Sequence, residues 1–220
     1  MVWRVRMVAG GAAFLGALWL PACGSESSVS EDRRHQERDA ELARTLSNAA
    51  GEDALNPFAA AQTLAEDSIG AAVASTVDQT WVRKMIEHQE GTARMAQILL
   101  NLNSKPEVRR AAERVQQDAH ARVETLTKLR ESSIGSDAKS AEIFHPNTSE
   151  MFSNMTKVQA SSVERLWALK MLDYNRGGVN LAGLEVSRGS DDRIRTAARE
   201  LASALAHEAD TLQQLAKQPQ

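Results

Sequence analysis

Cysteine is almost absent from this sequence, because Cys23 is the only one among 220 residues. A disulfide needs two thiols and a thiolate metal centre needs several, so a single chain can build neither. Aromatic residues are also few, at 4% of the chain, whereas 42% of the residues are hydrophobic and 25% are charged. This composition is typical of one globular domain made of helices rich in alanine, leucine, arginine and glutamate.

An excess of positive charge is missing as well. The chain has 26 basic and 29 acidic residues, a formal net charge of −3, and therefore no basic footprint for nucleic acid. Glycine-rich phosphate loops, a Gly-x-Ser-x-Gly elbow and paired Glu-x-x-His motifs on long helices are not found either. We expect neither a nucleic-acid partner nor enzymatic activity.

The N-terminus has the pattern of an export signal. Arg4 and Arg6 precede an apolar run that ends at Leu20, which is too short to span a bilayer comfortably but suits a signal core. The following Leu-Pro-Ala-Cys sequence resembles a bacterial lipobox, in which the cysteine, here Cys23, becomes lipid-modified. An ordinary signal peptide or an uncleaved anchor is the alternative. We predict a lipoprotein signal peptide at 1–22, a flexible tether at 23–30, and an exported protein held in the cell envelope by its lipid.

One segment of the chain is repeated at an offset of 86 residues. Trp81 aligns with Trp167 and Met85 with Met171, and roughly a quarter of the aligned positions are identical without any insertion. Such self-similarity indicates a duplicated structural unit. In each copy a hydroxyl residue precedes apolar residues at three-four spacing, which predicts a capped helix.

Each copy is predicted to contain two helices joined by a short turn. In the first copy the second helix is predicted to begin at Ser104, which can form a capping box with Glu107 around Pro106. In the second copy Gly189 is predicted to end one helix and Ser190 to cap the next.

Two helical hairpins, each with an apolar stripe to bury, predict an all-α fold in which they form a four-helix bundle. Extra helices are expected at 31–50, after Pro57, and over a short stretch near 150–158. The predicted organisation after the tether is an N-terminal helical segment at 31–70, a first hairpin at 75–131, a crossover at 132–160 and a second hairpin at 161–216.

The sequence MIEHQEGTARMA at 85–96, followed by PEVRRAAERV, resembles the bacterial family called domain of unknown function 305. That family has a ferritin-like fold and a Met-Ile-x-His-His-Gln-x-Ala helix that leads to a Met-Ala pair, and some members are exported and linked to copper. In this chain the second histidine of the motif is replaced by Gln89, and a later family glutamate falls at Arg122 in the first copy and Glu208 in the second. The resemblance therefore implies a ferritin-like bundle with a degenerate metal motif.

Four polar residues occupy positions on otherwise apolar helix faces. His88 and Tyr174 are equivalent in the two copies, and Arg122 and Glu208 are equivalent on the partner helices. Both hairpins turn at matching positions, so the four residues are expected within about one turn of the same depth, at about 1.5 Å per residue. We predict that they form a buried polar cluster.

Two interpretations of this cluster are open. In the first, imidazole, thioether and carboxylate groups bind a metal such as copper(I), which favours soft ligands. The candidate ligands are His88, Met85, Met95, Met171 and Glu208, with His120 and His207 nearby.

In the second interpretation Arg122 and Glu208 form a buried ion pair, capped by Tyr174 and His88, in the space of a former metal site. A fixed guanidinium a few ångströms from a metal ion would repel it by several kcal/mol, on the order given by Coulomb's law at intermediate dielectric. This favours the ion pair. The expected protein is thus a non-enzymatic, lipid-anchored bundle with a partly lost metal site, whereas a copper-binding lipoprotein remains the alternative and a homodimer remains open.

Overall fold

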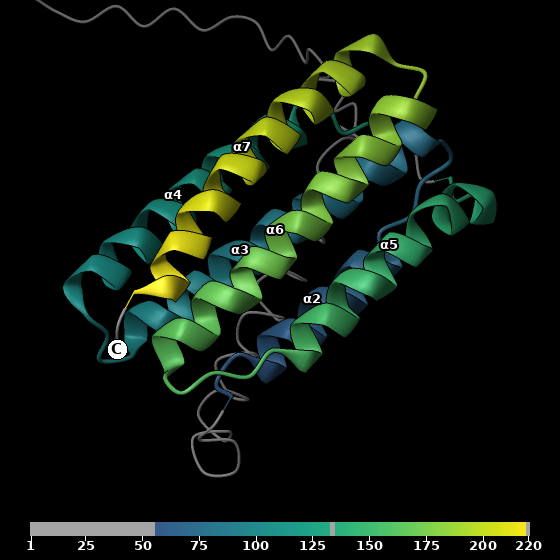
Figure 1. The fold of residues 1–220 in the computed structure, drawn as a ribbon. Helices are drawn as coiled ribbons and strands as arrows, with labels where there is room; N and C mark the ends of the chain where they lie inside the picture. The colour runs from purple at the N-terminus through teal and green to yellow at the C-terminus, as the bar shows by residue number, and fades with distance from the viewer. Residues whose placement is uncertain (1–55, 133–134, 219–220) are drawn as a thin grey trace, which may run out of the picture. The chain divides into compact units, whose positions relative to one another are not determined.

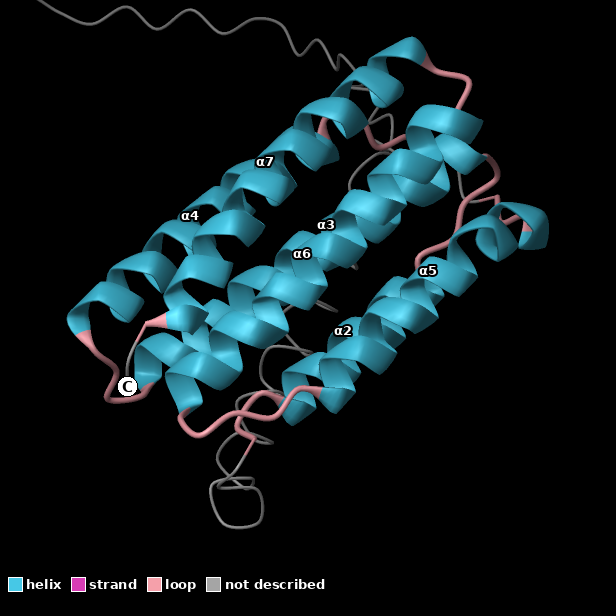
Figure 2. Cartoon of the chain, in the orientation of Figure 1, coloured by secondary structure: helices cyan, strands magenta, loops and turns pink. Residues whose placement is uncertain are grey.

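The computed structural model describes residues 56–132 and 135–218, and within them all regular secondary structure is helical (Figure 2). These residues belong to one unit of the chain, which runs from Leu42 to Gln220. The predicted signal peptide, Cys23, the tether and the predicted helix at 31–50 lie outside the described residues. No helix in the described ranges combines the length and the apolar character that crossing a membrane requires.

Four long helices form the two predicted hairpins. Helix α3 (Val77–Asn101) packs against α4 (Pro106–Thr127), and α6 (Val163–Arg188) packs against α7 (Asp192–Lys217). The two hairpins meet through α3 and α6, which lie side by side at the centre (Figure 1). The all-α bundle of duplicated hairpins is therefore confirmed.

The central helices α3 and α6 run in opposite directions. Trp81 near the start of α3 shares an apolar cluster with Leu181 near the end of α6. Trp167 near the start of α6 shares a second cluster with Leu99 near the end of α3. All four side chains are fully buried. Equivalent tryptophans thus lie at opposite ends of the helix pair, and the two halves of the bundle are related by an approximate two-fold axis.

Two further helices cover the face of α3 and α6 that lies opposite α4 and α7 (Figure 1). They are α2 (Ala59–Ala71), which confirms the helix expected after Pro57, and α5 (Ala138–Lys157). The short helix predicted in the crossover was wrong in length, because α5 has 20 residues and contains Pro146. Proline normally ends a helix, but buried Phe144 and Phe152 anchor α5 in both apolar clusters on either side of it.

The duplication includes these flanking helices. Lys84 on α3 donates a hydrogen bond of 2.6 Å to the carbonyl of Ile69 in the last turn of α2. Its equivalent, Lys170 on α6, donates one of 2.7 Å to the carbonyl of Met155 in the last turn of α5. Each buried cation thus binds the carbonyl end of a flanking helix, where the helix dipole favours positive charge. Within the described residues the repeated unit has three helices, and the segment predicted as a crossover with a short helix contains the counterpart of α2.

The predicted helix starts agree with the structure in two cases and differ in two. The hydroxyls of Thr76 and Ser162 accept hydrogen bonds from backbone N–H groups in the first turns of α3 and α6, as predicted. The capping box at Ser104 was wrong, because Lys105 is the N-cap residue of α4 and no side chain caps that helix. Asp191, rather than Ser190, caps α7. Ser190 instead donates hydrogen bonds to Asp78 on α3. A capping rule considers only residues near in sequence, so it could not predict this contact.

Candidate functional site

An ion pair joins the two halves of the bundle. Arg122 on α4 lies 2.9 Å from Glu208 on α7, measured from Nη1 to Oε2. Their side chains are 17% and 10% exposed, so the predicted pair forms but is partly rather than fully buried. The two residues are equivalent in the duplication, at a separation of 86 residues. The pair therefore lies where the approximate two-fold axis brings equivalent positions of α4 and α7 together.

Two amide side chains extend the ion pair into the central helices. Asn175 Nδ2 on α6 donates a hydrogen bond of 2.8 Å to Glu208 Oε1, and Arg122 donates a longer one of 3.4 Å to Gln89 Oε1 on α3. Gln89 and Asn175 are also equivalent in the duplication. Their role was not predicted from the sequence, in which Gln89 was interpreted only as a replaced histidine. The 86-residue offset, which aligns one amide with the other, was the signal for it.

His88 is fully buried, and both of its ring nitrogens are engaged. Nε2 lies 3.0 Å from the carbonyl oxygen of Tyr174, and Nδ1 lies 3.0 Å from the amide nitrogen of Gln89. A carbonyl oxygen only accepts, so Nε2 carries the hydrogen and the single lone pair on Nδ1 accepts from Gln89. Burial lowers the pKa of His88 to about 4, with Arg122 adding to the effect and the Tyr174 carbonyl opposing it. The imidazole is therefore neutral near pH 7.

Tyr174 does not cap the ion pair, which corrects that part of the prediction. Its ring stacks on the ring of His88, with centroids 4.0 Å apart and planes 7° apart. Its hydroxyl is buried, has no hydrogen-bond partner among the described residues, and lies beside Gly91. Burial raises the pKa of Tyr174 well above its usual value. The phenol is thus a neutral packing group, and His88 reaches the pair only through Gln89.

The predicted methionine ligands belong to the two apolar clusters rather than to the polar cluster around the ion pair. Met85 belongs to the apolar cluster of Trp81, whereas Met95 and Met171 belong to that of Trp167, so the thioethers fill the two separate apolar clusters. His120 and His207 are exposed. Among the described residues, no group of three or more His, Cys, Asp or Glu side chains is placed to hold a metal ion. Of the proposed ligands, only His88 and Glu208 take part in the central polar cluster.

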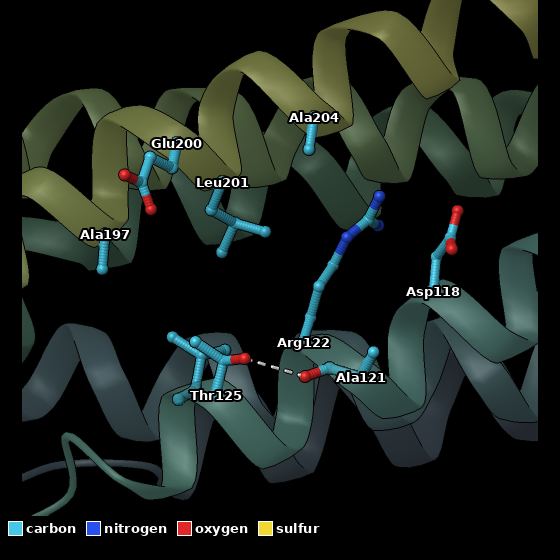
Figure 3. Close-up of a pocket in the computed structure, with 9 residues that line it drawn as sticks. Asp118, Ala121, Arg122, Thr125, Ala197, Glu200, Leu201 and Ala204 are labelled. Carbon is cyan, nitrogen blue, oxygen red and sulfur yellow. Dashed lines mark hydrogen bonds between the residues drawn. The ribbon is translucent and has the colours of Figure 1, made fainter.

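A groove of about 400 Å³ lies between α4 and α7 beside the ion pair. Figure 3 shows Arg122 rising from α4 toward α7 inside it, while the hydroxyl of Thr125 donates to the carbonyl of Ala121 on its own helix. The groove is mainly apolar, with carboxylates at its sides. Its lining residues are Asp118, Ala121, Arg122, Thr125, Leu126, Ala197, Glu200, Leu201 and Ala204.

These features define a class of protein: within the described residues it is an all-α bundle of two duplicated three-helix units, whose centre is an ion pair connected through the amide of Gln89 to a neutral histidine. The sequence matches the family model described as "Domain of unknown function (DUF305)" over residues 17–130 and again over 78–216. The chain therefore belongs to the DUF305 family, and the two matches confirm the duplication.

Two solved structures of the family resemble this chain. The protein from Streptomyces coelicolor described as "putative secreted protein DUF305" is 20% identical, with a TM-score of 0.51, over 64% of this chain and 90% of the other. A DUF305 fragment from Deinococcus radiodurans is 13% identical, with a TM-score of 0.49, over 66% of this chain and 97% of the fragment. The first likeness supports the all-α fold. No curated protein matches the chain.

Proposed function

We propose that this chain is an exported, lipid-anchored and non-enzymatic bundle protein, whose central site serves as a structural joint between its two halves. Export is supported by the N-terminal sequence and by the family neighbour described as secreted. The observation that carries the proposal is the Arg122–Glu208 pair, since the protein's own charges neutralise each other where equivalent helices meet.

Copper binding through His88 and the methionines is the alternative. It is disfavoured because Gln89 engages the only lone pair of His88 and because the methionines lie in separate clusters. A metal at this site would also face the guanidinium of Arg122, which stays charged at any relevant pH. Binding would therefore require the polar chain from His88 to Glu208 to be broken.

Lipid anchoring is tested by the variant Cys23→Ser, because a hydroxyl cannot replace the thiol that is acylated. We expect the full chain to fractionate with membranes and the variant to appear in the soluble fraction or to keep an uncleaved leader. Mass spectrometry of the N-terminus distinguishes these two results. A wild-type chain that carries no lipid on Cys23 would contradict the proposal.

Metal content tests the structural role of the centre. We expect wild-type protein, purified without an affinity tag, to contain well under one equivalent of copper or iron. In a copper(I) titration against a competing chelator, we expect His88→Gln to behave as the wild type does. His145→Ala is the control, since His145 is an exposed histidine on α5 that reports surface binding. Stoichiometric metal that is lost in His88→Gln and retained in His145→Ala would establish the copper-binding alternative.

A further inference from the structure

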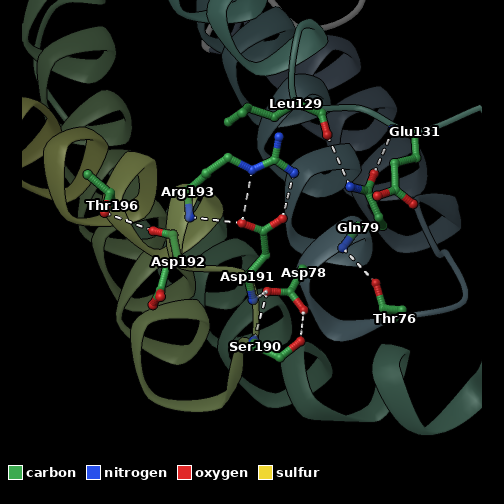
Figure 4. A network of polar contacts seen from close by, with 10 residues as sticks. All are labelled: Thr76, Asp78, Gln79, Leu129, Glu131, Ser190, Asp191, Asp192, Arg193 and Thr196. Atoms are coloured by element: carbon green, nitrogen blue, oxygen red, sulfur yellow. Dashed lines mark hydrogen bonds and ion pairs between the residues drawn. The ribbon is translucent and has the colours of Figure 1, made fainter.

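A second polar cluster lies at one end of the bundle, away from the ion pair. Asp78 at the start of α3 binds the turn between α6 and α7 through three hydrogen bonds (Figure 4). Its Oδ1 accepts from the backbone N–H groups of Ser190 and Asp191, each at 2.8 Å, and its Oδ2 accepts from the Ser190 hydroxyl at 2.9 Å. This one carboxylate therefore attaches the turn of the second hairpin to the first hairpin.

Glu185, in the last turn of α6, lies directly beneath this turn. The residue is fully buried, and neither oxygen of its carboxyl group accepts a hydrogen bond from the described residues. A Cβ atom placed on Gly189 would come within 2.6 Å of Glu185 Cδ, so the glycine closes the turn over the carboxyl group. Glu185 faces the carboxyl group of Asp78. Two carboxyl groups thus share a buried site, where at most one of them is readily ionised.

The charges around Glu185 decide which group holds the proton. Burial, a hydrogen bond with the Asp78 side chain and the negative charges of Asp78 and Asp191 together raise the pKa of Glu185 to about 8, while Arg195 on α7 opposes them. For Asp78, burial raises the pKa, but the hydrogen bonds from the turn lower it on balance. Arg195 is already paired with Asp192 and also donates to the carbonyl of Gly189 at 3.4 Å. The pKa values of the two carboxyl groups thus differ widely, so the proton is on Glu185 and the negative charge is on Asp78.

We propose that Glu185 and Asp78 share one proton, and that this proton holds the α6–α7 turn against the start of α3. When the proton is lost, two carboxylates face each other beneath Gly189 and the attachment of the turn weakens. The end of the bundle is therefore a pH-sensitive joint. This inference is independent of lipid anchoring and of the role of the central ion pair.

The sign of the pH dependence follows from the two states of the chain. Folded protein keeps the Glu185 proton up to about pH 8, whereas unfolded protein releases it near the ordinary pKa of 4.5, so stability falls as the pH rises between these values. His88 has the opposite effect between about 4 and 6.5, because its folded pKa is lowered. The pKa of Lys84 is lowered to about 8 by burial, so its cost to stability is relieved only as the pH rises from about 8 toward 10.5. The interval from pH 6.5 to 8 therefore lies above the titration of His88 and below that of Lys84.

Urea unfolding of the full chain across pH 6.5 to 8 tests the shared proton. We expect the folding equilibrium constant of the wild type to fall on the order of tenfold across this interval, and that of Glu185→Gln to stay nearly constant. The glutamine amide can still donate to Asp78 but does not titrate. Asp173→Asn is the matched control, because burial also raises the pKa of Asp173 from an ordinary value of 3.8, yet that group lies about 18 Å from Glu185 along the same helix, at about 1.5 Å per residue. It should follow the wild type. Equal pH dependence in the wild type and Glu185→Gln would overturn the proposal.

Nuclear magnetic resonance gives a test that needs no variant. The side-chain carboxyl carbon of Glu185 should titrate with a midpoint near pH 8, and the amide signals of Ser190 and Asp191 should shift with the same midpoint. A Glu185 midpoint near 4.5 would overturn the shared proton. Amide signals of the turn that do not follow Glu185 would overturn the joint.

Discussion

Replacing Glu208 with alanine is expected to lower the free energy of unfolding by about 3 kcal/mol, and replacing Arg122 with alanine by a similar amount. Each change leaves the partner's charge in a site where the side chains are only 17% and 10% exposed. Glu208→Ala also removes the acceptor of the Asn175 amide. This loss is at the lower end of the range of about 3 to 5 kcal/mol for breaking a buried ion pair, because both side chains are partly exposed to water.

The double variant Arg122→Ala/Glu208→Ala is expected to lose less than the sum of the two single losses, by about 1 to 3 kcal/mol, because neither charge is then left alone. Urea unfolding of the four proteins measures this coupling. The control is the exposed pair of Arg109 and Glu113 on α4, whose side chains are 48% and 46% exposed. Alanine at either control position should change stability by less than about 1 kcal/mol. Additive losses at the central pair would show that it does not join the halves.

The opposite charges of this pair make physical sense at an approximate two-fold axis. A residue at such an axis faces its own copy, so an identical pair of acidic residues would repel there unless a cation or a shared proton lay between them. Divergence of the two copies into Arg122 and Glu208 replaces that repulsion with attraction. The same reasoning applies to His88 and Tyr174, since the divergence of the copies allows a stacked pair in which the imidazole also binds the Tyr174 carbonyl.

The ion pair could be predicted from the sequence because two independent patterns located it. Three-four spacing assigned Arg122 and Glu208 to the buried faces of their helices, and the 86-residue offset gave them the same depth. The direction of a side chain within the core could not be predicted in this way, because it depends on the space that neighbouring side chains leave. Tyr174 turns toward the gap beside Gly91, and no pattern in its own helix specifies that choice.

The proton-sharing site could have been found by comparing the copies more closely. Glu185 aligns with Leu99, a fully buried apolar residue, so an acid stands where the duplicated fold requires burial. The apolar periodicity of α6 alone does not indicate that Glu185 is buried. The hydrogen bonds of Asp78 to the α6–α7 turn were beyond sequence analysis, because they join residues more than a hundred positions apart and depend on how the two hairpins meet.

Gly177→Ala is expected to destabilise the protein by about 2 kcal/mol, because the added methyl group would overpack the contact between α5 and α6. A Cβ atom at Gly177 would lie 2.7 Å from Met151 Cβ, which belongs to the rigid base of that side chain and cannot swing away. Relief would require the two helices to move apart. The better helix propensity of alanine, about 1 kcal/mol over glycine, offsets only part of this cost.

Gly183 provides a matched control in the same helix, since nothing lies within 4 Å of a Cβ atom placed there. Gly183→Ala should therefore stabilise the protein by about 0.5 to 1 kcal/mol, through the lower entropy of the unfolded chain. The first copy also suggests a rescue, because its equivalent of Gly177, Gly91, faces the small side chain of Ala65 in place of Met151. Met151→Ala keeps Cβ but removes Cγ and Sδ, which a Cβ atom at Gly177 would also meet, so it should relieve part of the Gly177→Ala loss and the double variant should lose less than the two single losses combined. If Gly177→Ala and Gly183→Ala shifted the urea midpoint in the same direction, the close approach of α5 and α6 at Gly177 would not be a determinant of this fold.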